Sequence, residues 1–287
     1  MNFSRDLSKT FLLRLLPLAL LLVVGCGVAR AQTPTPTPPA DDEPDFIVPA
    51  RPTFSNPAEF QRPGVLQLEY GFSGNWRAPG DASEVDTPLA LRFAVSRRLL
   101  LEFDGDTPIS QSVGGVRNTG TGDTLLGAQV VLRHESKTRP GFALAYYIKL
   151  PSASAEKGLG TGRVDHNLIA LISKNIRGTT FDFNAIYLLA GRTTDTGHAS
   201  SGQAALAASR NITKRFGVQG EVSGFTRNDA QAGAMFALGV VTYQVNRRLV
   251  FDGGVRAGLT PEAPRVGAVA GLTVGIADLY RKHRRHT

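Results

Sequence analysis

The sequence predicts an all-β fold, a closed antiparallel transmembrane β-barrel of about twelve strands. Short turns that carry basic residues recur, as at 96–98, 211–215 and 246–248, and each leads at once into an alternating apolar segment. These segments run about ten residues, which is the length a strand needs to cross a bilayer. The connections on the other side are longer, Gly-rich and polar, and this asymmetry is typical of outer-membrane barrels.

Residues 1–31 have the layout of a signal peptide. Arg5 and Lys9 give a positive start, an apolar core runs from residue 15 to residue 25, and Ala29-Arg30-Ala31 is a small-x-small cleavage site. The core is too short to span a bilayer as a helix. We therefore expect export through the inner membrane, removal of this segment, and a destination in a bacterial outer membrane.

Cys26 is the only cysteine of the chain. Cleavage after Ala31 leaves the mature chain without cysteine, which excludes disulfides and thiolate metal sites. No His, Asp and Glu cluster has metal-binding spacing, so no cofactor is expected. One alternative stays open: Val23-Val24-Gly25-Cys26 resembles a lipobox, and Cys26 would then be lipidated.

Residues 32–63 differ in composition from the rest of the chain. Thr-Pro repeats span 33–39, acidic residues follow at 41–45, and further prolines come after them. Proline supplies no backbone donor to a sheet and favours an extended polyproline conformation. We expect a flexible periplasmic arm, with a plug folded into the lumen as the less favoured alternative. At the other end, residues 281–287 form a basic C-terminal tail, also expected in the periplasm.

The barrel is expected over residues 64–280, in twelve segments. Tight turns follow the even-numbered segments and longer connections follow the odd-numbered ones, as an even strand count with both termini on one side requires. The longer loops then face the outside of the cell. The approximate spans are 64–74, 87–96, 98–106, 122–134, 140–150, 164–174, 179–191, 202–212, 215–226, 232–244, 247–258 and 265–277.

Successive side chains of a strand point to opposite faces. In the first segment Leu66, Leu68 and Tyr70 share one face, while Gln67 and Glu69 share the other. The apolar faces suit lipid and the charged faces suit the interior. Because buried ions usually pair, the interior is either a salt-bridged, side-chain-filled core or a ladder that lines a solute path. The residues predicted to face the lumen are Glu69, Arg92, Glu102, Arg133, Lys149, Asp182, Glu221, Asp252 and Arg256.

The middle of the chain carries a more specific pattern. One strand ends in Lys-Leu-Pro at 149–151, a Lys-Gly-Leu-Gly-Thr-Gly loop follows at 157–162 with an Asp shortly after, and Asn-Ala-Ile-Tyr begins at 184. These features resemble the outer-membrane transporter family named for the MetA pathway of phenol degradation, over about residues 64–280. The resemblance implies a barrel that takes up small, often aromatic or hydrophobic, compounds. The Pro-rich arm is not part of it.

The Gly-rich loop is a candidate constriction. A phosphate-binding loop would open a helix, but a strand follows here. We therefore expect an outer loop, or a loop folded into the mouth of the barrel. Its residues of interest are Lys157, Gly158, Gly160, Gly162 and Asp165.

Three functions fit a barrel of this kind. The first is passive transport of small compounds, and the second is a structural or adhesive barrel with a plugged lumen. The third is a membrane-embedded hydrolase, since outer-membrane phospholipases use a Ser-His-Asn site on twelve strands. His166 lies beside polar residues, but no serine has a matching spacing, and we expect no enzyme.

The expected partners are outer-membrane lipid, the barrel-assembly machinery and a small-molecule solute. After residue 31 the chain has 28 basic and 23 acidic residues, and these are dispersed. Such a balance gives no reason to expect nucleic acid. The barrel is expected to be a monomer.

Overall fold

The computed structural model describes residues 45–192, 196–227 and 232–280. They form thirteen strands and one short turn of 3-10 helix, η1 (Pro79–Asp81). Within these ranges no helix is long and apolar enough to cross a membrane. The strands are β1 (Val65–Ala78), β2 (Ala82–Ala94), β3 (Leu99–Val113), β4 (Val116–Gly120), β5 (Thr124–Arg133), β6 (Gly141–Leu150), β7 (Asp165–Ile176), β8 (Thr179–Gly191), β9 (His198–Asn211), β10 (Phe216–Phe225), β11 (Ala234–Asn246), β12 (Leu249–Gly258) and β13 (Val266–Asp278).

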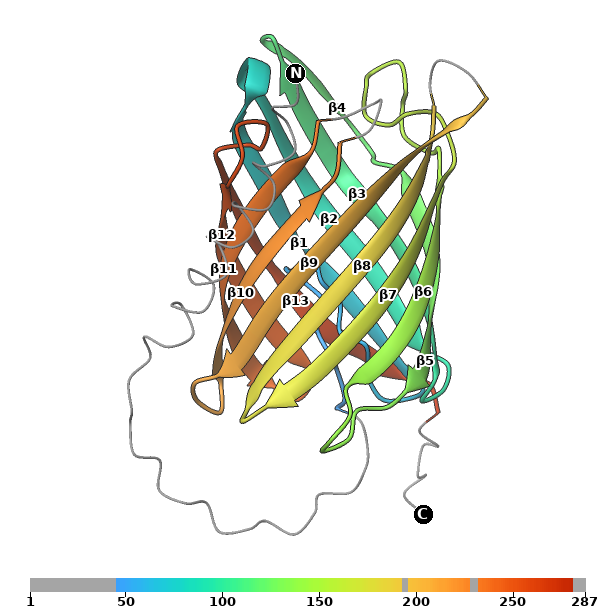
Figure 1. The fold of residues 1–287 in the computed structure, drawn as a ribbon, viewed down its shortest axis with the longest axis vertical. Helices are drawn as coiled ribbons and strands as arrows, with labels where there is room; N and C mark the ends of the chain where they lie inside the picture. Colours follow the sequence, from blue (N-terminus) through green and yellow to red (C-terminus); the bar gives the residue numbers. More distant parts are fainter. Residues whose placement is uncertain (1–44, 193–195, 228–231, 281–287) are drawn as a thin grey trace, which may run out of the picture. The chain divides into compact units, whose positions relative to one another are not determined.

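The strands close into a ring of antiparallel pairs (Figure 1). β1 pairs with both β2 and β13, β2 pairs with β3, and the order then runs from β3 through β5 round to β13. β4 and β5 lie along the same side of β3, opposite residues 109–113 and 99–104. The described strands therefore occupy twelve positions, and the predicted closed barrel of about twelve strands is confirmed. Among the described strands, closure pairs both edges of the twelve that form the ring, and only the short β4 pairs on one side.

The strands form because apolar side chains alternate along them. In β6, Ala143, Ala145 and Tyr147 are buried in the interior, while Leu144 and Tyr146 point outward and are 38% and 46% exposed. Exposed leucine, valine and aromatic residues recur on β3, β5, β7, β8, β10 and β12. A soluble protein rarely exposes so much apolar surface, whereas acyl chains suit it.

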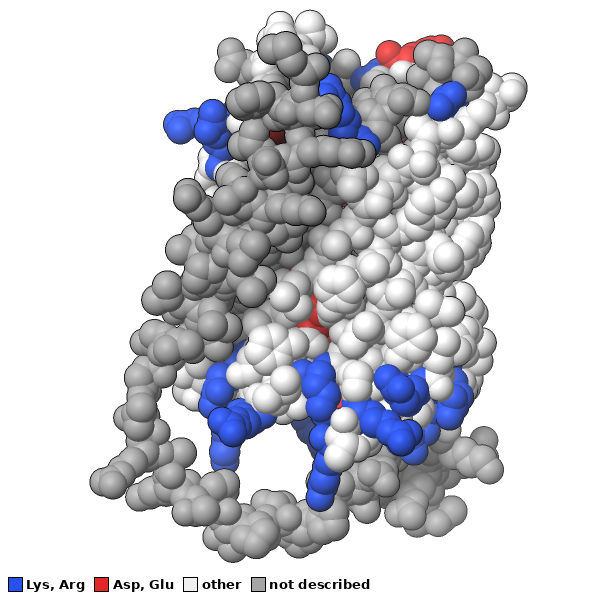
Figure 2. Space-filling view, viewed as in Figure 1, with Lys and Arg blue, Asp and Glu red and all other residues white. Residues whose placement is uncertain are grey.

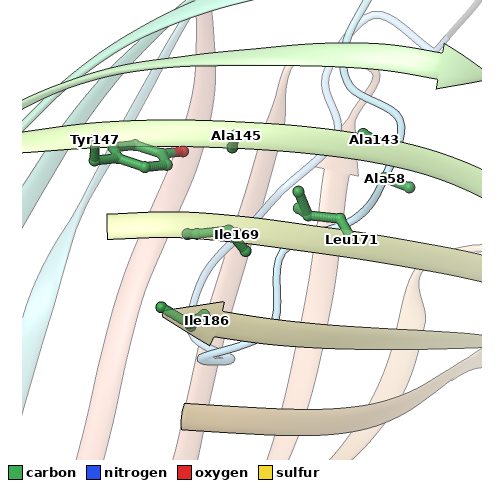
Figure 3. Packing of buried hydrophobic residues seen from close by; sticks show 7 residues of the cluster. All are labelled: Ala58, Ala143, Ala145, Tyr147, Ile169, Leu171 and Ile186. Atoms are coloured by element: carbon green, nitrogen blue, oxygen red, sulfur yellow. The ribbon is translucent and has the colours of Figure 1, made fainter. Parts of the chain in front are cut away.

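The predicted segment 164–174 alternates least in sequence, and the structure gives the reason. In β7, Leu168 and Ile172 face outward, while Ile169 and Leu171 are buried inside. The inner side is apolar because it packs against Ala58, which comes from the segment before β1 (Figure 3). An apolar run here reflects a barrel whose interior is filled.

Two connections expected as long loops are extended hairpins. β1 and β2 pair as far as Ala78 and Ala82, so that only η1 joins them. β3 and β4 are joined by Gly114-Gly115 alone, both with positive φ. Two glycines are favoured in the two-residue turns that match strand twist. The hairpins extend the wall beyond the neighbouring strands, because each added residue pair supplies hydrogen-bond partners to the backbones of both strands.

The other connections divide the barrel into two ends. The turn end carries residues 95–98, 134–140, 177–178, 212–215 and 247–248; the loop end carries 151–164, 192–197, 226–233, 259–265 and the two hairpin tips. The connection 134–140, expected as a tight turn, has seven residues. Its Glu135 carboxylate accepts hydrogen bonds from the Lys174 ammonium and the Asn175 backbone, which holds it against the end of β7.

Candidate channel lumen

A segment of the chain itself occupies the turn-end half of the lumen. Residues 45–63, here called the luminal segment, enter and leave at the turn end, where the Arg62 amide donates to the Asp45 carbonyl at 2.9 Å. Between these points the segment contacts inward-facing side chains of β1, β2, β5, β7, β8, β10 and β12. These residues were predicted to belong to a periplasmic arm; they form the plug that was the less favoured alternative.

Other parts of that prediction lie outside the described residues. These parts are the signal peptide at 1–31, the Thr-Pro repeats at 32–44 and the basic tail at 281–287. The reason for the different position of 45–63 is visible in its backbone. A proline-rich segment cannot pair as a strand, yet its remaining amides must still find acceptors, and the barrel wall supplies them.

Two buried carboxylates bind the backbone of the luminal segment. Glu69 accepts from the amides of Ala50 and Arg51 at 2.9 and 3.0 Å. Glu221 accepts from the amides of Phe54 and Ser55 at 3.0 and 2.7 Å. Hydrogen bonds to an ionised acceptor are about twice as strong as neutral ones. Both carboxylates were predicted to face the lumen, and their role there is to bind peptide amides.

Buried amide side chains replace a strand partner at two further places. The Asn184 side chain accepts from the Asn56 amide and donates to the Asn56 carbonyl, both at 2.8 Å. Gln67 makes the same two-way contact with Val48, at 3.0 and 2.9 Å. The Ser173 hydroxyl accepts from the Ala58 amide and donates to Asp182, which explains the inward position of that carboxylate.

Two arginines bind carboxylates inside the barrel. Arg51 of the luminal segment pairs with Asp252 at 3.0 Å. Its guanidinium lies over Gly71 and Gly271, where a Cβ atom at either position would collide with it. Glycine at these two positions therefore leaves room for the guanidinium to approach the sheet closely.

The second arginine, Arg92, is fully buried and lies 3.3 Å from Glu69 and 3.4 Å from Glu102. It also donates to the Val48 carbonyl, so that it links the barrel wall to the luminal segment. The Glu102 carboxylate accepts a further hydrogen bond from the Tyr147 hydroxyl at 3.0 Å. The predicted residues Glu69, Arg92 and Glu102 thus form one connected network.

The candidate constriction loop reaches the interior through one apolar residue. Leu159 is buried against Ile109 of β3 and Ala153. Lys157 and Gly158 are exposed, and Gly158 and Gly162 have positive φ, which suits glycine. Gly160 is half-buried, and a Cβ there would meet the side chains of Ala153 and Asp123.

Lys149 closes the base of that loop. Its ammonium binds Asp123 at 3.0 Å and Asp165 at 2.8 Å, and it donates to the Thr161 hydroxyl. Asp165 also accepts from the Gly191 amide at 2.8 Å. Lys149 was predicted to face the lumen and Asp165 to belong to the constriction loop. The structure places both in one cluster.

The remaining two predicted lumen residues lie near the ends of the barrel. Arg256 is half-buried at the loop end and donates to Asn75 at 3.2 Å. Arg133 is exposed at the turn end, where it donates to the Pro140 carbonyl at 3.0 Å. A register shift between residues 131 and 133 ends the regular alternation just before it.

A cavity of about 320 Å³ lies between the luminal segment and the wall formed by β1, β2, β3 and β5. Glu69, Glu102, Asp104 and Asp106 line it, together with apolar groups such as Leu125. Asp104 and Asp106 were not among the predicted lumen residues, although acidic side chains at 102, 104 and 106 share one strand face. That spacing could have identified them. A second cavity, of about 260 Å³, lies between the extended hairpins and is lined in part by Glu84 and Gln111.

The candidate hydrolase residue lies elsewhere. His166 is hydrogen-bonded through Nδ1 to the Tyr146 hydroxyl at 2.6 Å, and its ring lies 5.9 Å from that of His198. Tyr146 faces outward, and His198 is exposed. Within the described ranges no group of three or more His, Cys, Asp or Glu side chains is placed to hold a metal ion.

These features define a class: a closed outer-membrane-type barrel whose lumen is half filled by a segment that precedes β1, with an acidic cavity beside that segment. The chain belongs to the family described as "Putative MetA-pathway of phenol degradation", whose model matches residues 50–275. The resemblance noted from the Gly-rich loop is thereby confirmed. The match begins inside the luminal segment, which is consistent with its close integration into the barrel.

Solved structures share the fold at low identity. The COG4313 outer membrane channel from Pseudomonas putida F1 is 14% identical, with a TM-score of 0.60 over 76% of this chain and 97% of that one. The NanC porin is 10% identical, with a TM-score of 0.51 over 74% of this chain and 99% of that one. No curated protein matches the sequence.

Proposed function

We propose that this protein is an outer-membrane channel for passive transport of small compounds and that its luminal segment closes the channel at rest. The observation that carries the proposal is the arrangement of the lumen. A segment tied to seven strands fills the turn-end half, while a cavity of about 320 Å³ remains above it. Membership of the MetA-pathway family and the two channel-like folds support it.

The proposed location is the outer membrane, reached with the signal peptide at 1–31. The outward apolar surface supports this location because it requires lipid. The barrel-assembly machinery and outer-membrane lipid are then the partners of its biogenesis. With both described ends of the chain at the turn end, the turns face the periplasm and the loops face outward.

The proposed path begins between the loops and leads past the loop 151–164 into the cavity. Carboxylates and apolar groups line this cavity together. Such a lining suits a small compound that has an apolar body, aromatic or aliphatic, and a polar or cationic group. Passage into the periplasm then requires the luminal segment to move, because it occupies the lower half of the lumen.

Planar-bilayer recording tests this mechanism. In one variant, residues 46–61 are replaced by a short Gly-Ser linker that joins Asp45 to Arg62, whose backbones already touch. The native protein is expected to stay closed most of the time, and the variant to show sustained conductance. Heat-modifiable gel mobility controls for a folded barrel. Equal conductance of the two proteins would contradict gating by the segment.

A structural or adhesive barrel is the second candidate, and the luminal segment favours it too. A plug with this many hydrogen bonds could be a permanent filling. Silence of both the native protein and the linker variant in bilayers, together with no swelling of liposomes in small solutes, would support this alternative. Enzymatic function is not proposed, because His166 pairs with an outward tyrosine.

A further inference from the structure

The turn end of the barrel carries a dense band of positive charge. Twelve Lys and Arg residues and a single carboxylate, Glu135, lie in the residues 95–98, 133–140, 174–178, 210–215 and 246–248. The twelve are called the basic collar, and all but the half-buried Lys174 are exposed. They are Arg97, Arg98, Arg133, Lys137, Arg139, Lys174, Arg177, Arg210, Lys214, Arg215, Arg247 and Arg248.

The loop end has no such excess. By sequence, its connections 79–81, 114–115, 151–164, 192–197, 226–233 and 259–265 contain five basic and five acidic residues. The positive charge is therefore a property of one end and not of exposed connections in general. Each of the five turn-end connections, taken together with the strand ends that border it, contributes at least two cations, so the collar extends along all five turns. On the face drawn in Figure 2, Lys and Arg form a band beneath a surface almost free of charge.

The collar adjoins the outward apolar surface. Phe216 follows Arg215 directly, is 50% exposed, and its ring lies 4.9 Å from that of Tyr243. The Tyr243 hydroxyl accepts from Arg215 at 3.5 Å. Aromatic residues with polar tips mark the boundary between hydrocarbon and headgroups in membrane barrels. This pair places Arg215, and with it the turn 212–215, at the depth of lipid headgroups.

Three arginines of the collar donate to uncharged acceptors within the protein. Arg98 donates to the carbonyls of residues 131 and 132, Arg133 to that of Pro140, and Arg210 to the Thr179 hydroxyl. Lys174 pairs with Glu135. Neutral acceptors orient a guanidinium without compensating its charge, so these three arginines keep a positive charge that an external anion can bind.

From this arrangement we infer that the basic collar binds the phosphate groups of anionic phospholipids in the leaflet at the turn end. Clusters of Lys and Arg at the membrane surface attract anionic lipids, and guanidinium groups bind phosphate bidentately. The inference depends on the barrel lying in a membrane and does not depend on whether the lumen conducts. It gives the protein a fixed depth and orientation, with the turn end toward the leaflet that is rich in anionic phospholipid.

The test measures lipid enrichment around the full-length protein. Nanodiscs are assembled from phosphatidylcholine with about one tenth spin-labelled phosphatidylglycerol, and the motionally restricted fraction is recorded. A collar variant, Lys137→Gln with Arg177→Gln and Lys214→Gln, is compared with a loop-end variant, Arg117→Gln with Arg163→Gln and Arg265→Gln. Both variants lose three positive charges from exposed positions.

Enrichment of phosphatidylglycerol is expected for the native protein and the loop-end variant, and a severalfold lower enrichment for the collar variant, because each surface cation changes local lipid affinity on the order of fivefold. Equal losses in both variants, or no enrichment for the native protein, would overturn the inference. Selectivity of the collar for lipid A over phosphatidylglycerol would also overturn it. Should the collar variant fail to fold, a salt titration of the native protein decides: enrichment that does not fall as ions screen the collar contradicts the inference.

Discussion

The two halves of the lumen use similar side chains in different ways. At the turn end Glu69, Glu221 and Asp252 each contact the luminal segment, and their charge is offset by backbone amides or by Arg51. Toward the loop end Asp104 and Asp106 line a cavity that Glu69 only borders, and neither of the two contacts the luminal segment in a described hydrogen bond or ion pair. The comparison teaches that inward charge in a narrow barrel does not by itself mean a conducting path. A structural role can be assigned to an inward carboxylate only when its hydrogen-bond or ion-pair partner is known.

Removal of the central cation is expected to have the largest effect. Arg92→Ala leaves the Glu69 and Glu102 carboxylates buried without their partner, and breaking a buried ion pair in this way costs about 3–5 kcal/mol. The midpoint of the heat-induced gel shift in detergent should fall by many degrees. Arg133→Ala, at an exposed position, is the matched control and should leave the midpoint nearly unchanged. Equal midpoints for the two variants would mean that the network contributes little.

Loss of one amide-binding carboxylate should loosen the luminal segment without unfolding the barrel. Glu221→Ala removes the acceptor of two backbone amides and of the Ser55 hydroxyl, at a cost of about 1.5–3 kcal/mol for each charged hydrogen bond. Protease cleavage within residues 45–63 should become faster, while the barrel strands stay protected. Unchanged cleavage would show that the other contacts are sufficient to hold the segment.

A methyl group added at Gly271 tests whether the Arg51 contact holds the luminal segment in place. Gly271→Ala places a Cβ against the Arg51 guanidinium, and overpacking of this kind costs about 1–3 kcal/mol. Opening events in bilayer recordings should become more frequent if the segment is the gate. Gly239→Ala is the control, because its Cβ would meet nothing within 4 Å. A similar gating change in both variants would point to a general effect of strand glycines.

The smallest stability effect is expected at the loop-end cavity. Asp106→Asn removes a charge from the cavity wall. Among the described contacts no ion pair holds this side chain, so the free energy of unfolding should change by less than about 0.5 kcal/mol. In the linker variant the same substitution should reduce the preference for cations, measured as the reversal potential in a salt gradient. A larger stability loss than for Glu221→Ala would reverse the proposed difference between the two halves.

Local patterns in the sequence were sufficient for the wall of the barrel. The alternation of apolar and other residues in β6 and β8 predicts which side chains face lipid, because successive side chains of any strand point to opposite faces. The same alternation identified Glu69, Arg92, Glu102, Lys149, Asp182, Glu221 and Asp252 as charged groups on the inner face. It could equally have included Asp104 and Asp106.

The long-range partners could not be predicted. Glu221 and Ser55 are 166 residues apart, and Arg51 and Asp252 are 201 residues apart. Nothing in the Pro-rich composition of residues 45–63 distinguishes a solvated arm from a plug, since both lack sheet pairing. The run of apolar residues in β7 was the one local sign of a filled interior. Its meaning depends on Ala58, which lies over a hundred residues earlier.

The sequence by itself determined a closed, lipid-facing barrel of about twelve strands. Side-chain alternation, strand length and the residues of the turns are local properties, so each can be recognised from neighbouring residues alone. Only the tertiary structure decided what fills that barrel and which charges are already compensated. Closing the ring brings the inner faces of distant strands around one segment, and only there do buried amides and carboxylates find each other.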